Sequence, residues 1–130
     1  MPEAERATFL EMILQIKKQL NPVFNILEFK GMDDMLTDKP LTPQDIYNHD
    51  IKDCVMKADC MLAICDFPST GLGYEMATAV EKQNISVLAM AHQNRVVGRI
   101  IRGITHPGFR FETYSSVNDI VDKAKEILTK

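Results

Sequence analysis

Residues 67–75 of this 130-residue chain hold the side chains best suited to chemistry, in the order Phe-Pro-Ser-Thr-Gly-Leu-Gly-Tyr-Glu. The two glycines let the backbone approach a ligand closely, and the hydroxyls of Ser69 and Thr70 can donate hydrogen bonds to it. The carboxylate of Glu75 can act as a nucleophile or as a base. A plain tight turn, in which Glu75 is merely favoured by a helix dipole, would use the same residues. The stretch therefore indicates a small-ligand site without identifying the ligand.

Two common nucleotide-binding motifs do not fit this stretch. The GxGxxG fingerprint of dinucleotide-binding proteins would need a small residue at position 76, where Met76 stands. A P-loop would need Gly-Lys-Ser or Gly-Lys-Thr after the glycines, and the sequence has neither. The stretch is therefore expected to bind its ligand in another way.

The elements on either side of this stretch determine where it lies. Residues 60–65 form a short apolar run, which is typical of a buried strand, and residues 76–82 have the apolar spacing of a helix. Met76, Ala79 and Val80 would face inward from that helix. We therefore expect a strand, a glycine-containing loop and a helix with Glu75 in its first turn. Ligands of open parallel sheets bind in such loops, at the carboxyl ends of the strands.

Helices and strands alternate along the rest of the chain. Apolar spacing predicts helices at residues 2–20, 42–59, 93–101 and 117–128, and further strands at 23–29, 85–90 and 109–111. Residues 32–41 have the composition of a loop that is long enough to form part of a pocket wall. The alternation predicts an α/β fold in which helices cover both faces of a mostly parallel sheet. Residues 69–75 would then lie at one edge of the sheet, at its carboxyl end.

Composition argues against several classes of function. The length predicts one domain spanning residues 1–130, and a net charge of −3 gives no electrostatic basis for binding nucleic acid. No apolar run approaches the ~20 residues that span a bilayer, and no signal-peptide pattern is present, so we expect a cytoplasmic protein without membrane contact. The three cysteines form no CxxC motif and the three histidines lack ligand spacing. Reduced thiols, and no metal, are therefore expected.

Residues 57–75 resemble the nucleoside 2-deoxyribosyltransferase superfamily, and most closely its deoxynucleoside monophosphate N-glycosidase branch. The motif of that branch, Pro-Ser-Leu-Gly-Val-Gly-Tyr-Glu, matches residues 68–75, and the similarity continues through residues 95–103. The resemblance implies a flavodoxin-like three-layer sandwich. It also implies cleavage or transfer at the N-glycosidic bond of a deoxynucleoside or its monophosphate, by a homodimer that needs no metal or organic cofactor. Its small-molecule partner would be the nucleoside or nucleotide.

The resemblance also implies roles for individual residues. Glu75 matches the family nucleophile, which forms a covalent glycosyl ester, and an aspartate in the preceding helix acts in acid/base chemistry or orients the substrate. Asp50 is the best match to that aspartate. It lies one residue farther from Asp59 than in the family, so Asp53 stays open as an alternative. The substrate would be held by the hydroxyls and glycines of the motif, which are Ser69, Thr70, Gly71 and Gly73.

Two departures from the family pattern leave the function open. The family's first strand and the glycine-rich turn after it have no counterpart in the chain, which starts at the helix that would follow them. Gly98 stands where the monophosphate branch has a serine that reaches across the dimer to the phosphate. The pocket could then be incomplete, specific for an unphosphorylated nucleoside, or completed by residues upstream of position 1. Two alternatives to an enzyme follow: an inactive nucleotide-binding domain, or a flavodoxin-like domain for an unrelated small ligand.

Overall fold

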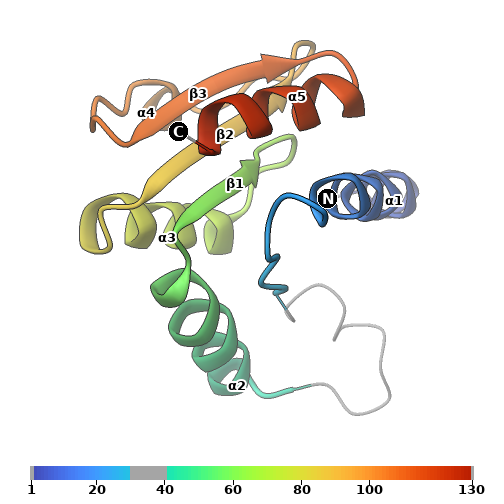
Figure 1. Ribbon diagram of the computed structural model, residues 1–130. Coiled ribbons are helices and arrows are strands. Elements are labelled where there is room, and N and C mark those ends of the chain that lie inside the picture. The colour runs from blue at the N-terminus through green and yellow to red at the C-terminus, as the bar shows by residue number, and fades with distance from the viewer. Residues whose placement is uncertain (1, 30–40, 130) are drawn as a thin grey trace.

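Three parallel strands form one sheet in the order β1-β2-β3. A computed structural model describes residues 2–29 and 41–129 and shows β1 (Cys60–Ile64), β2 (Ser86–His92) and β3 (Phe109–Tyr114). The register pairs Leu62 with Leu88 and Leu88 with Arg110. All three predicted strands at these places are confirmed, and β1 is an edge strand of the sheet, as expected (Figure 1). Residues 32–40 of the predicted loop lie outside the described residues.

Helices precede and connect the strands. Pro43 begins a run that is helical as far as Lys57 but changes its hydrogen-bonding pattern twice, and the helix after β1 changes once. The helical elements are α1 (Glu3–Leu20), α2 (Pro43–Tyr47), the π-helix η2 (Asn48–Cys54), the 3₁₀-helix η3 (Val55–Lys57), α3 (Thr70–Ala77), the π-helix η4 (Thr78–Lys82), α4 (Arg99–Arg102) and α5 (Val117–Leu128). None of the helices in the described part of the chain is both long and apolar enough to cross a membrane.

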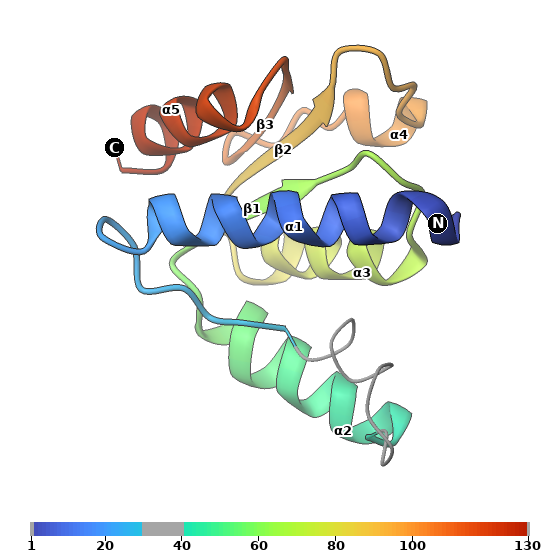
Figure 2. The ribbon, with the colours of Figure 1, turned by 90° about the vertical axis from the view of Figure 1, so that its right-hand side faces the viewer.

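Helices cover both faces of the sheet. Val87 and Ala89 of β2 point to the face packed by η2, α3 and η4, whereas Leu88 and Met90 point to the face packed by α1 and α5. All four side chains are buried, because successive side chains of a strand point to opposite faces. Figure 2 shows α1 crossing in front of the sheet, with α3 on the other side. The predicted α/β, flavodoxin-like arrangement is therefore confirmed.

The strand predicted at residues 23–29 is wrong. The amides of Val23 and Phe24 both donate to the carbonyl of Leu20, at 2.9 Å, so these residues form the turn that ends α1. The Glu28 carbonyl accepts from the side chain of His49 and does not join a β-ladder. An apolar run becomes a strand only where a neighbouring strand pairs with it, and residues 25–29 have no such partner among the described residues.

The helix predicted at residues 93–101 is largely wrong as well. The amide of Gln93 donates to the carbonyl of Tyr114, so this residue extends the hydrogen bonding of the sheet. The amide of Arg95 then closes a turn on the carbonyl of His92. Only α4 is helical, and it begins after Gly98. The apolar side chain of Val97 is buried, whereas Val96 is almost fully exposed.

Candidate active site

Ser69 begins helix α3 at the carboxyl end of β1. Its backbone is extended, its Oγ accepts from the amide of Leu72 at 3.1 Å, and its carbonyl accepts from the amide of Gly73 at 3.1 Å. The capped helix therefore includes both Gly71 and Gly73, which the sequence predicted in a loop. Glu75 accordingly lies in the second turn of the helix and not in its first. The prediction failed because the cap of Ser69 starts the helix before the glycines.

Three of the predicted site residues lie close together: Ser69, Gly71 and Glu75. A Cβ atom added at Gly71 would lie 3.8 Å from Oε1 of Glu75 and 3.8 Å from Oγ of Ser69. Because Gly71 has no side chain, the space between the hydroxyl and the carboxylate stays open. Thr70 is exposed beside it, and the amides of Thr70 and Gly71 belong to the first turn, where a helix offers hydrogen-bond donors. A Cβ at Gly73 would contact nothing within 4 Å.

The Glu75 carboxyl group is held in a poorly solvated position. Its Oε2 is buried and has no hydrogen-bond partner among the described residues. Burial, and secondly the negative charge of Asp50, raise the pKa of Glu75 to about 7. The helix dipole acts mainly within the first turn, so its effect on Glu75 is outweighed. The start of the helix therefore does not keep Glu75 fully ionised, and the side chain is partly protonated near neutral pH.

Asp50 faces Glu75 from the helix before β1. Only 7% of Asp50 is exposed, and its charge is felt by Glu75 although 25 residues separate them. Asp50 belongs to the π-helix η2, and its carbonyl accepts from the amide of Val55, five residues later. A π-turn holds one residue more than an α-turn.

Asp53, the alternative to Asp50, lies in a different environment. It is exposed and forms an ion pair with Lys57, with Nζ 3.6 Å from Oδ1. Its charge is not among the causes of the raised pKa of Glu75. The structure therefore brings Asp50, and not Asp53, together with Glu75.

The loop that carries Ser69 is tied to the ends of the other strands. Tyr114, at the end of β3, donates its hydroxyl hydrogen to Asp66, and the amide of His92 donates to Asp66 Oδ1 at 2.9 Å. The guanidinium of Arg95 lies 4.6 Å from the ring centre of Phe67. Sequence reasoning missed these supporting residues, although an aspartate directly after a buried strand was a usable signal.

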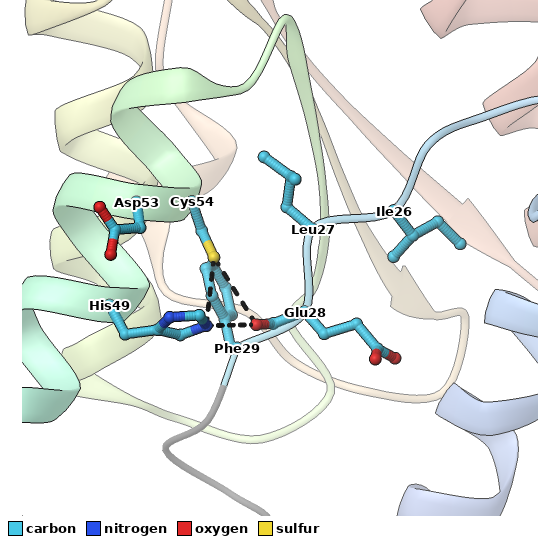
Figure 3. A pocket seen from close by; sticks show the side chains of 7 residues that line it. All are labelled: Ile26, Leu27, Glu28, Phe29, His49, Asp53 and Cys54. Atoms are coloured by element: carbon cyan, nitrogen blue, oxygen red, sulfur yellow. Dashed lines mark hydrogen bonds between the residues drawn. The ribbon is translucent and has the colours of Figure 1, made fainter.

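A hollow of about 490 Å³ opens on another side of the helix that carries Asp50. Figure 3 shows the residues that line it: Ile26, Leu27, Glu28, Phe29, His49, Asp53 and Cys54. His49 Nε2 donates to the Glu28 carbonyl at 2.8 Å, and Cys54 Sγ donates to the same carbonyl at 3.6 Å. Since Nε2 carries the hydrogen in this contact, it cannot take a proton from the thiol 3.7 Å away. The lining includes neither Glu75 nor Asp50, so this hollow lies apart from the carboxylate pair.

The chain is similar to a curated protein of Thermofilum pendens. That protein is named "Putative 2'-deoxynucleoside 5'-phosphate N-hydrolase 1", and the two are 33% identical over 98 residues. The match covers 74% of this chain and 68% of the relative. The chain belongs to the 2′-deoxynucleoside 5′-phosphate N-hydrolase family. This family agrees with the branch that residues 68–75 resemble. No family model matches the chain.

Proposed function

We propose that the chain hydrolyses the N-glycosidic bond of a 2′-deoxynucleoside 5′-monophosphate and releases the free base. The observation that supports this most is the pairing of Glu75 with Asp50 at the carboxyl end of β1, beside the capped start of α3. The name of the Thermofilum pendens relative supplies the substrate class. Paired carboxylates are the groups with which glycosidases commonly cleave such bonds.

In the first step, Glu75 acts as the nucleophile. An ionised oxygen of its carboxylate bonds to C1′ of the deoxyribose while the bond from C1′ to the base nitrogen breaks. The electron pair of that bond leaves with the base, which takes up a proton from the solvent, because Asp50 carries a negative charge beside Glu75. The oxygen proposed to attack is Oε1, which faces the space beside Gly71, 3.8 Å from the position of an added Cβ atom.

In the second step, water releases the sugar from Glu75. Asp50 takes a proton from the water, whose oxygen bonds to C1′ as the ester bond to Glu75 breaks, and then returns this proton to the solvent. Deoxyribose 5-phosphate leaves and the carboxylate is restored. Were a second base to take the place of water, the same intermediate would yield transfer instead of hydrolysis.

The start of α3 is proposed to hold the sugar phosphate. The hydroxyls of Ser69 and Thr70 and the amides of the first turn are hydrogen-bond donors, and the N-terminal end of a helix favours an anion. Gly71 leaves room between these donors and Glu75. A phosphate held there would keep C1′ near the carboxylate, so we expect monophosphates to be better substrates than nucleosides.

Base release from deoxynucleoside monophosphates tests this function. We expect the parent protein to release free base, detected by chromatography, and Glu75→Ala to abolish the release. Glu81→Gln is the matched control, because Glu81 is an exposed carboxylate on the same run of helix and should leave the rate unchanged. Asp50→Asn should lower the rate at least tenfold, whereas Asp53→Asn should not.

Three results would decide against the proposal. Base release by Glu75→Ala at the parent's rate would exclude Glu75 as the nucleophile. Binding of monophosphates by the parent without any base release would favour an inactive nucleotide-binding domain. If the parent neither binds monophosphates nor releases base from them, a function on these nucleotides is excluded.

A further inference from the structure

Two tyrosines from different helices face each other at the surface. Tyr47 ends α2 and Tyr74 lies in α3, and their ring centres are 6.3 Å apart with the planes inclined by 59°. A hydrogen bond between the two side chains, together with the proximity of Tyr74, raises the pKa of Tyr47. The two rings therefore form a tilted aromatic contact that joins α2 to α3.

This pair lies next to the two carboxylates. Tyr74 directly precedes Glu75 in α3, and Tyr47 comes three residues before Asp50, which is about one helical turn. The ring contact of the tyrosines and the electrostatic interaction of the carboxylates thus link the same two helical runs. The tyrosines are 43% and 48% exposed where Asp50 is 7% exposed, so the rings form the outer part of this link between the two helical runs.

Packing of the core does not account for the two rings. Tyr47 is 43% exposed and Tyr74 is 48% exposed, whereas the core residues of these helices, such as Ile51 and Met76, are buried. Lys52 Nζ lies over the Tyr47 ring, 5.8 Å from its centre, and a ligand that stacks on Tyr47 would share the ring with this ammonium group or displace it. Exposed aromatic rings beside reactive groups are suited to a ligand with a flat ring of its own.

We propose that Tyr47 and Tyr74 form the wall against which the nucleobase stacks while C1′ of the sugar faces Glu75. This inference rests on the proposed function, and it assigns the recognition of the base, as distinct from the phosphate, to α2 and α3. Stacking on aromatic side chains tolerates different bases, because every base has a π-face. We therefore expect the protein to accept monophosphates of several bases, unless other groups restrict the choice.

The composition of the chain makes binding directly measurable. It has no tryptophan and three tyrosines, of which Tyr114 is buried. A ligand that touches tyrosine directly is therefore expected to change the fluorescence of Tyr47 and Tyr74, because Tyr114 is shielded from it. In a Glu75→Gln background, which binds without turnover, we expect a deoxynucleoside monophosphate to quench this fluorescence, after correction for absorption by the base. Deoxyribose 5-phosphate, which has no base, should not quench it.

Substitutions by leucine and by phenylalanine then distinguish the contribution of the tyrosine ring to binding from that of its hydroxyl. Tyr47→Leu and Tyr74→Leu should each raise the Kd for the monophosphate about 5- to 100-fold, as expected for a lost stacking contact, and leave the Kd for deoxyribose 5-phosphate unchanged. Tyr47→Phe and Tyr74→Phe keep the rings and should stay within about twofold of the parent. Leu14→Ala is the control, because Leu14 is an exposed apolar residue on α1. The Kd values for the Leu and control variants are measured by calorimetry in the same background.

The outcomes separate this inference from the proposed function. If the parent releases base but the Leu variants bind the monophosphate as tightly as the parent, the wall is disproved and the function stands. If the Leu variants lose affinity for deoxyribose 5-phosphate to the same extent, the rings do not recognise the base and the inference fails. If the parent neither binds monophosphate nor releases base, both proposals fail together.

Discussion

At the scale of single residues, the notable group is a carboxylate that is costly to ionise. Burial and the charge of Asp50 raise the pKa of Glu75 to about 7, and Oε2 has no hydrogen-bond partner in the described part of the chain. A structural glutamate would more often be solvated or bonded to a donor. Perturbed carboxylates of this kind are frequent at functional sites, which is why Glu75 is the centre of the proposed mechanism.

The raised pKa predicts how activity depends on pH. Glu75 must be ionised to attack C1′, so kcat/KM for base release should rise with pH and level off above about 8. Asp50→Asn removes a negative charge, which lowers the pKa of Glu75 and should shift this rise to lower pH while the maximal rate falls. The measurement is a pH–rate profile for the parent and the variant.

Asp53→Asn provides the control for this shift. Asp53 is exposed and paired with Lys57, so its substitution should leave the profile in place. A profile for Asp50→Asn that does not move, or that moves to higher pH, would contradict the assignment of Asp50 as the charged neighbour of Glu75.

At the scale of elements, two helices begin in the same way, but only one begins at the candidate site. Ser69 Oγ accepts from the amide three residues later in α3, and Ser116 Oγ does the same at the start of α5, at 3.2 Å. Both serines have extended backbones. The pair therefore allows the structural role of a cap to be separated from a role in binding.

Replacing each capping serine by alanine distinguishes its role in stability from a role in binding. Ser69→Ala and Ser116→Ala should each lower the free energy of unfolding by about 0.5–2 kcal/mol, because each loses one capping hydrogen bond. Only Ser69→Ala should also lower kcat/KM for monophosphates, since Ser69 is proposed to contact the phosphate. Denaturant unfolding and base release measure the two effects. Equal losses of activity in both variants would show that Ser69 acts through stability alone.

At the scale of the whole molecule, two exposed apolar side chains lie near the α4 end of the sheet. Val96 is 96% exposed and Ile100 is 84% exposed, and they belong to the segment in which the family resemblance predicts a dimer contact. Apolar side chains gathered on a surface are typical of a protein interface. We therefore propose that a second copy of the chain covers them.

The mass of the protein in solution tests the dimer. Light scattering should give twice the chain mass of 14.7 kDa for the parent, and Ile100→Asp should reduce it to the mass of one chain. Leu14→Asp places the same charge on α1, where the side chain is 63% exposed, and should leave the dimer intact. A parent that stays monomeric at high concentration would contradict the proposal.

Much of the fold was predictable because it depends on local pattern. The apolar runs at residues 60–65 and 85–90 and the spacing in α1 and α5 each indicate one element, and these elements form as predicted. The Thr42 capping box and the Ser116 cap were readable for the same reason. The segment at 23–29 was misjudged because its apolar content suits a strand, whereas pairing depends on a neighbour far away in the sequence.

For the candidate site too, some features followed from the local sequence and others from contacts between residues that are distant in the sequence. The types and order of residues 68–75 were enough to single out Glu75 as a carboxylate able to do chemistry, and to suggest the family. Whether that carboxylate is ionised depended on burial and on Asp50, 25 residues away, and so on the packing of η2 against α3. The choice of Asp50 over Asp53 depended on which of the two side chains is buried near Glu75. Electrostatic effects act through space, so only the folded chain decided which charges meet.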